Sequence, residues 1–222
     1  MHPDPESGIE GLLKGDSSAL VPIGDISEAR IGHTFREGVT PDPEGGLPVL
    51  QSKDLAESIA SDGAGLVRAL VPRFDPWLVT TEGDLVFLPR GTRFPALAVM
   101  GDLVGALVAA PLYLIRPDRS QADAAYLAAL INTPALQAAL KAEAKGSYIP
   151  QVPAEAIRAL RLPLPPLPEQ RAIAALAELS REEARIAAAL AAHRSVWLHA
   201  LAVHRDGKGS KRNSRRHANA PG

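Results

Sequence analysis

Residues 161–204 constrain the fold more than any other part of this sequence. The first eight of them include four prolines, and neither glycine nor proline occurs between Pro168 and Gly207. Because proline fixes φ and lacks a backbone N–H, the opening stretch predicts a stiff connection. Pro168 suits the first turn of a helix, and Glu169 lies where the helix dipole favours an acid. The pattern predicts one helix over residues 168–204, on the order of 50 Å long at about 1.5 Å per residue.

A helix of this length needs a surface to pack against. Its large apolar residues recur at nearly heptad spacing, with Glu183 and His193 interrupting the series. The apolar positions are Leu176, Leu179, Ile186, Leu190, Trp197 and Leu201. This spacing indicates packing against a second long helix, and docking of the same stripe onto the chain's own domain is the alternative.

The composition indicates a globular protein with an appendage. At 222 residues the chain has room for one good-sized domain, and its 46% hydrophobic content is enough for a buried core. The absence of cysteine excludes disulfides and cysteine-bound zinc, so we expect a cytoplasmic location. A net charge of -1 argues against a protein that coats nucleic acid without selection. Any nucleic-acid surface must therefore be a local basic patch.

The rest of the chain predicts a mixed α+β domain. Short apolar runs at 21–34, 47–51, 66–71 and 77–81 suit strands, and the run 96–115 suits two strands joined by a turn at Gly101 rather than a membrane span. From Gln121 the apolar period changes to that of helices. We expect two of them on either side of Asn132, with Thr133 capping the second.

These observations divide the chain into four parts. We expect a flexible N-terminal tail over residues 1–17, where proline, glycine and acidic residues occur without an apolar period. The mixed domain follows over residues 18–167, and the long helix over 168–204. Residues 205–222 form a basic segment that we expect to be disordered.

Four segments, in this order, resemble a target-recognition domain of the type I restriction-modification specificity subunit. They are 21–26 with 32–34, 47–55, 82–91 and 146–170, of which the last, with its proline-rich strand, Glu169-Gln170 and helix, is the most specific. The resemblance implies a non-catalytic, DNA-binding subunit that directs an adenine methyltransferase and, through it, a restriction subunit. It also implies that S-adenosylmethionine, magnesium and ATP belong to those partners, and that this chain needs no cofactor or metal.

The family pattern has two recognition domains and two long helices in one chain, whereas this chain has one of each. The resemblance therefore implies a half subunit, which would restore two lobes by forming a homodimer through the long helix. A symmetric pair makes a self-complementary interface. Each lobe would then recognise the same half-site, and the target would be an interrupted palindrome.

Polar and basic residues at strand ends are the candidates for contacts with double-stranded DNA, because cations bind phosphates and short polar groups read base edges. The candidates are Gln51, Ser52, Lys53, Arg68, Arg90, Thr92, Arg93, Lys145, Ser147 and Tyr148.

Two other functions remain open at this point. Pro41-Asp42 followed by Lys53 resembles the metal-binding core of many nucleases, although the second acid of that core is absent. A small divergent metal-dependent nuclease is therefore one alternative. A protein-binding adaptor that acts through its helix is the other.

Overall fold

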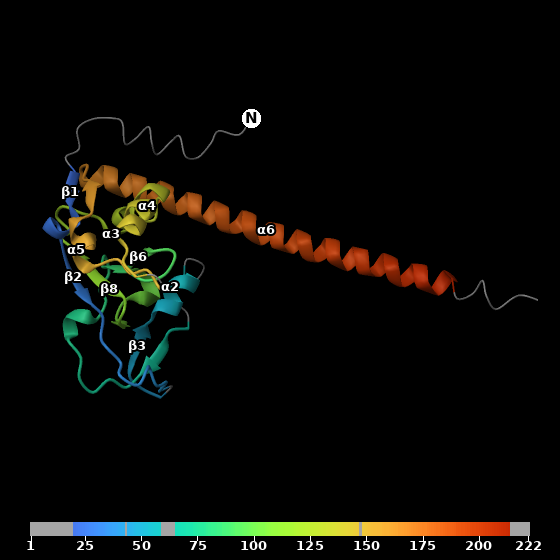
Figure 1. The fold of residues 1–222 in the computed structure, drawn as a ribbon, viewed down its shortest axis with the longest axis horizontal. Helices are drawn as coiled ribbons and strands as arrows, with labels where there is room; N and C mark the ends of the chain where they lie inside the picture. The colour runs from blue at the N-terminus through green and yellow to red at the C-terminus, as the bar shows by residue number, and fades with distance from the viewer. Residues whose placement is uncertain (1–19, 43, 59–64, 147, 214–222) are drawn as a thin grey trace, which may run out of the picture. The chain divides into compact units, whose positions relative to one another are not determined.

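The computed structural model describes residues 20–42, 44–58, 65–146 and 148–213, without the side chains of 56–58, 195–196 and 198–213. The strands are β1 (Leu20–Pro22), β2 (Ser27–Ile31), β3 (Leu47–Leu50), β4 (Val67–Ala69), β5 (Leu85–Phe87), β6 (Ala96–Ala98), β7 (Leu107–Val108), β8 (Tyr113–Pro117) and β9 (Arg161–Pro163). The α-helices are α2 (Ser52–Ser58), α3 (Ala124–Ile131), α4 (Pro134–Glu143), α5 (Ala154–Ala159) and α6 (Leu167–Asn213) (Figure 1). Three short 3-10 helices are η1 (Ile23–Asp25), η2 (Pro76–Leu78) and η3 (Gly101–Leu103). The chain divides into two compact units, the first ending at Leu176 and the second beginning at Ala177.

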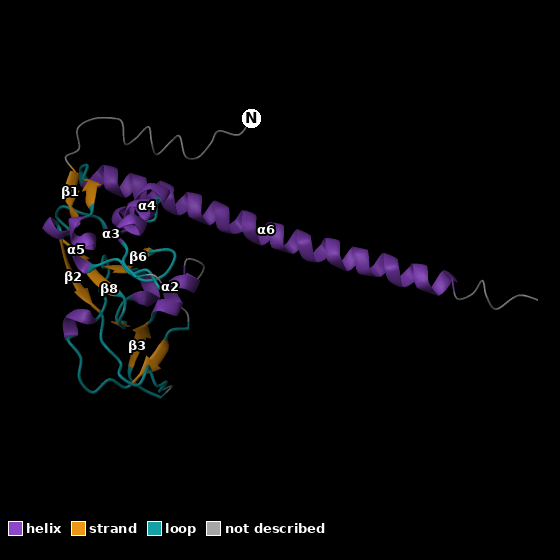
Figure 2. Cartoon of the chain, in the orientation of Figure 1, coloured by secondary structure: helices purple, strands orange, loops and turns teal. Residues whose placement is uncertain are grey.

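The strands of the first unit form three small sheets (Figure 2). The largest has the order β2-β8-β5-β6 and is antiparallel throughout. The second has the order β4-β3-β7, in which β3 and β7 are parallel. Strands β1 and β9 pair with each other, so the start of the first unit is joined to the segment just before α6. The fold is mixed α+β with a long C-terminal helix, as the sequence predicts.

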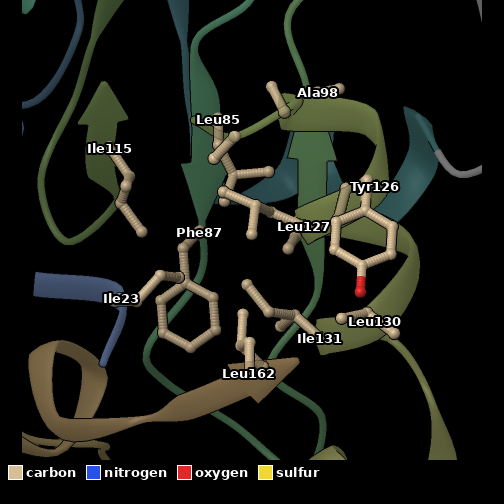
Figure 3. Packing of buried hydrophobic residues seen from close by; sticks show 14 of the residues in the cluster. Ile23, Leu85, Phe87, Ala98, Ile115, Tyr126, Leu127, Leu130, Ile131 and Leu162 are labelled. Atoms are coloured by element: carbon tan, nitrogen blue, oxygen red, sulfur yellow. The ribbon is translucent and has the colours of Figure 1, made fainter. Parts of the chain in front are cut away.

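Strand β5 organises the core because it is buried on both faces. Successive side chains of a strand point to opposite sides of the sheet. Accordingly Leu85 and Phe87 belong to one apolar cluster, while Val86 belongs to another. In Figure 3 the side chains of Phe87, Ile131 and Leu162 point toward one another, so β5, α3 and β9 contribute to the same core.

The two helices after β8 begin where capping residues predict. At the start of α3, the Asp123 side chain accepts hydrogen bonds from the backbone N–H groups of Ala125 and Tyr126. At the start of α4, the Thr133 hydroxyl accepts from the N–H of Leu136, and Pro134 occupies the first turn. The predicted break between two helices, with Thr133 as the cap, is confirmed.

The first turn of α6 is fixed within the first unit by Gln170, whose side chain is fully buried. Its amide oxygen accepts from the N–H of Asp123 at 2.9 Å, and its amide nitrogen donates to the carbonyls of Gln121 and Pro165 at 2.8 Å each. Nearby, the Tyr126 hydroxyl donates to the carbonyl of Pro163 at 2.8 Å. Burial, with the nearby charge of Glu169, raises the pKa of Tyr126 to about 12.

Two predicted elements are wrong. Segment 96–115 is not a hairpin, because β6 pairs with β5 whereas β8 pairs with β2 and β5. Residues 77–81 are not a strand, because the Asp75 side chain accepts from the N–H of Trp77 and begins η2. The sequence Asp-Pro favours such a turn over an extended chain. None of the described helices is long and apolar enough to cross a membrane.

The long helix continues beyond the predicted residue 204 and ends at Asn213. Residues 205–213, which the sequence analysis assigns to a disordered segment, are therefore helical. Glycine inside a helix costs only about 1 kcal/mol relative to alanine, so Gly207 and Gly209 weaken the helix without ending it. The predicted tail over 1–17 lies outside the described residues, as does 214–222.

Candidate nucleic-acid interface

The turn that joins β5 to β6 presents three of the predicted residues. Strand pairing brings Phe87 opposite Ala96, and the connecting segment exposes Arg90, Thr92 and Arg93. Gly91 lies within this turn with a φ of 115°, a conformation that favours glycine. The turn is therefore held at both ends by a buried sheet, while its basic side chains remain in solvent.

A second loop, over residues 145–151, is bonded to this turn. Lys145 and Gln151 close the loop by exchanging backbone hydrogen bonds of 2.9 and 2.8 Å. The N–H of Gly91 donates to the carbonyl of Pro150 at 3.0 Å, and the N–H of Val152 donates to the carbonyl of Pro89 at 2.8 Å. Segments more than fifty residues apart in sequence thus lie side by side.

This loop adds a third basic side chain and an aromatic one to the interface. Lys145 is exposed, and Tyr148 keeps 94% of its surface in solvent. Exposure on this scale is unusual for an aromatic residue in a folded domain. A tyrosine so placed offers a ring for stacking and a hydroxyl for hydrogen bonding. Ser147, also a predicted contact, lies outside the described residues.

A cavity of about 280 Å³ connects the turn to α4. Its lining residues come from the turn, from the α3–α4 junction and from α4, and they are Thr92, Arg93, Asn132, Pro134, Gln137, Ala138 and Lys141. Lys141 is exposed and brings a further cation to the same region. We call the set Arg90, Thr92, Arg93, Lys141, Lys145 and Tyr148 the basic surface.

The four cations of the basic surface are not engaged in described ion pairs. Within the residues that the structure describes, Arg90, Arg93, Lys141 and Lys145 form no ion pair. Their charge is therefore available to an anionic partner. A phosphate backbone is such a partner, because in DNA-binding proteins Arg and Lys side chains are common partners of phosphate oxygens.

A contrasting set of arginines surrounds Trp77, and these arginines are already paired. The guanidinium of Arg116 donates to both carboxylate oxygens of the fully buried Asp84 at 2.8 Å, and this hydrogen bonding raises the pKa of Arg116. Arg30 forms ion pairs with Asp75 and Glu28. The guanidinium carbon of Arg30 lies 4.4 Å from the centre of the Trp77 ring, and that of Arg116 lies 4.6 Å from it. Because these charges are neutralised, this region is less suited to bind phosphate.

The remaining predicted contacts lie on other elements. Gln51 precedes α2 and its N–H donates to the Asp54 carboxylate at 2.8 Å, while Ser52 and Lys53 form the first turn of that helix. Arg68 lies on β4 and donates to the carbonyl of Gly46 at 2.6 Å. These residues belong to the three-stranded sheet and its helix. No described contact joins them to the basic surface, so the structure brings together only part of the predicted set.

Sequence reasoning missed the two amides that hold the turn against the helices. Asn132 bonds to the backbone of Ala96, and Gln137 bonds to the backbone of Phe94. Both amides lie in a helical region that is otherwise rich in alanine and leucine. A polar side chain in such surroundings signals a specific hydrogen-bond partner. Which group is that partner can be seen only in the three-dimensional structure.

The predicted nuclease residues do not form a recognisable metal site. The Asp42 carboxylate accepts a hydrogen bond from the N–H of Glu44 at 3.2 Å, and Lys53 lies on α2. Among the described residues, no group of three or more His, Cys, Asp or Glu side chains could hold a metal ion.

The predicted apolar stripe of α6 faces solvent. Leu176, Leu179, Ile186, Leu190 and Trp197 each expose at least half of their surface. Leu201 lies in the helix, but its side chain is outside the described set.

Comparisons with solved structures give the same fold. The HsdS subunit from Thermoanaerobacter tengcongensis has a TM-score of 0.52 at 19% identity, over 83% of this chain and 41% of that chain. A structure described as showing complex assembly and conformational transition of the type I R-M system has a TM-score of 0.54 at 18% identity, over 82% of this chain and 45% of that one. This chain thus spans less than half the length of either. No curated protein matched it.

The sequence itself was also compared with models of protein families. The model described as the type I restriction modification DNA specificity domain matches residues 17–182. That range covers most of the chain and contains all of the basic surface together with the start of α6. The chain therefore belongs to the family of type I restriction modification DNA specificity domains.

Proposed function

We propose that this chain is a non-catalytic specificity subunit that recognises a DNA sequence and directs a separate adenine methyltransferase to it. A restriction subunit would join through the same complex, in the cytoplasm. The single observation that carries the proposal is the basic surface, in which two hydrogen-bonded loops and the neighbouring helix α4 present four cations that form no ion pair among the described residues. Loops on a rigid scaffold are the usual place for recognition residues.

The basic surface supports both parts of DNA recognition. Arginine can bond to two acceptors of guanine in the major groove, and cations bond to phosphates regardless of sequence. Tyr148 is free to stack or to donate a hydrogen bond. We assign residues 18–167 to this role. The methyl transfer from S-adenosylmethionine and the use of magnesium and ATP would belong to the partner subunits.

We further propose that two copies associate through α6. The helix exposes Leu179, Ile186 and Leu190 at near-heptad spacing, which is the arrangement that a coiled coil buries. The chain spans 41–45% of the length of the two solved neighbours, so two copies would approximate one such chain. A two-fold pair would recognise two identical half-sites, and α6 would set the distance between them.

The test is selection of bound duplexes from a random library by the purified full-length chain, alone and with a type I methyltransferase subunit. We expect an interrupted palindrome to be enriched. Replacing Arg90 by Gln should weaken binding to the selected duplex by about 5- to 150-fold, the usual range for one base contact. Arg158→Gln, an exposed arginine on α5, is the matched control and should bind normally.

Three outcomes would contradict the proposal. Failure to enrich any sequence would remove the recognition function and leave the protein-binding adaptor as the better account. Enrichment of an asymmetric or uninterrupted sequence would remove the two-fold pair. Magnesium-dependent cleavage by the chain alone would favour the nuclease.

A further inference from the structure

The cavity between the β5–β6 turn and α4 has a chemistry of its own. Thr92 and Arg93 line it from the turn, and Lys141 lines it from the helix. Asn132 and Gln137 also line it, and Pro134 and Ala138 supply apolar surface. Which of these polar groups is free decides what the cavity can bind.

The two amides are already committed to the backbone. The Asn132 amide oxygen accepts from the N–H of Ala96 at 3.0 Å, and its nitrogen donates to the carbonyl of Ala96 at 2.7 Å. The Gln137 amide oxygen accepts from the N–H of Phe94 at 3.0 Å, and its nitrogen donates to the carbonyls of Phe94 and Ile131 at 2.9 Å each. A free amide is suited to read adenine. Here a base would have to compete with backbone bonds that hold the turn in place.

The groups that remain are two cations and a hydroxyl. Arg93 and Lys141 make no ion pair or side-chain hydrogen bond within the described part of the chain. Thr92 is exposed beside them. Guanidinium and ammonium groups together with a hydroxyl donor are the usual partners of phosphate oxygens. Arg93, Lys141 and Thr92 all lie on elements that the surrounding hydrogen bonds hold in place.

We propose that this cavity holds a backbone phosphate of duplex DNA, bound by Arg93 and Lys141 with Thr92 as a further donor. The proposal rests on the function proposed above and assigns this part of the basic surface to position rather than to sequence. Reading of base edges then falls to the residues outside the cavity, Arg90, Lys145 and Tyr148. The bonds from Asn132 and Gln137 hold the residues before β6 against the α3–α4 junction and α4.

Salt dependence tests the assignment. Each phosphate contact contributes about 0.9 to the slope of log K against log salt concentration for duplex DNA. We would measure binding of the full-length chain to a 30-bp duplex of random sequence, roughly the length of a bipartite site, by fluorescence anisotropy from 50 to 200 mM salt, the interval over which such slopes show. Arg93→Gln and Lys141→Gln should each lower the magnitude of the slope, and the double variant should lower it by about 0.9, because the two cations share one phosphate. Arg158→Gln removes the same charge from α5 and should leave the slope unchanged.

A second measurement separates phosphate binding from base reading. For Arg93→Gln and Lys141→Gln, the fold-loss of affinity should be the same on the random duplex and on the duplex obtained by selection. A larger loss on the selected duplex would overturn the phosphate assignment, as would slopes equal to that of the wild type in variants with unchanged thermal unfolding. In both cases the wild type still binds DNA, so the proposed function stands. Absence of DNA binding by the wild type would instead remove the function itself.

Discussion

The two units differ in whether their apolar side chains are buried. In the first unit, apolar side chains close into a core, and Val86 and Leu114 retain no exposed surface. From Ala177 onward, every described side chain is exposed except that of Ala177 itself, and Leu179 and Trp197 each keep 69% of their surface in solvent. The first unit can therefore be stabilised by its own residues. The described part of the helix carries large apolar residues that remain exposed.

The two units also differ in whether their polar side chains are buried or exposed. In the first unit, each buried polar side-chain atom that the structure describes has a hydrogen-bond partner. On α6, by contrast, Arg181 pairs with Glu178 and Arg185 with Glu182 on the exposed surface. Such exposed pairs stabilise a helix only slightly. Mutations should therefore be costly in the first unit and nearly silent in the folding of the second.

The largest effect is expected at Asp84, which is buried and paired with Arg116. Asp84→Ala should lower the free energy of unfolding by about 3–5 kcal/mol, because it leaves Arg116 without its partner. Urea unfolding followed by tryptophan fluorescence would measure this in a Trp197→Phe background, where Trp77 is the only tryptophan. The exposed Asp102 on η3 gives the control Asp102→Ala. Equal stability of Asp84→Ala and Asp102→Ala would show that the buried pair with Arg116 does not stabilise the first unit.

A smaller loss, of about 2–3 kcal/mol, is expected for Gln170→Ala. The substitution removes the donor to the carbonyl of the buried Pro165, together with the part-buried bonds to the N–H of Asp123 and the carbonyl of Gln121. The neighbouring Arg171 is 66% exposed, and Arg171→Ala should change stability by less than about 0.5 kcal/mol. The same fluorescence assay applies. A loss for Arg171→Ala as large as that for Gln170→Ala would show that the helix start is stabilised by something other than the buried amide.

The smallest effect on folding, within about 0.5 kcal/mol, is expected for the double substitution Ile186→Ser and Leu190→Ser. These side chains are exposed, so the first unit should unfold as in the wild type. The change should appear in the mass measured by sedimentation, with the wild type a dimer and the variant a monomer. Ala188→Ser, at an exposed position between the two, should leave the dimer intact. A monomeric wild type would refute association through α6.

Local signals predicted much of the fold. Thr133-Pro134 marks a helix start because its hydroxyl and its missing N–H both act within one turn. The long helix followed from the absence of helix breakers over many residues. The mistaken hairpin over 96–115 shows the limit of such signals. Apolar runs reveal burial, but they do not reveal that β8 pairs with β2, a partner more than eighty residues earlier.

The candidate site was predictable only in part, for the same physical reason. Arg90 and Arg93 lie on one turn, so the sequence shows that they are neighbours. That Lys145 lies close to them depends on the bond from the N–H of Gly91 to the carbonyl of Pro150, which joins two distant segments. Asn132 and Gln137 could not be assigned a role, because an amide's partner is set by tertiary structure.

The amides of Asn132 and Gln137 also bear on how copies of this protein meet. Strand β6 is an edge of the four-stranded sheet, and an edge with open N–H and C=O groups invites a strand from another molecule. The two side chains occupy the outward-facing groups of Phe94 and Ala96. At these two residues the margin of the sheet therefore offers no open backbone group to a strand of another copy.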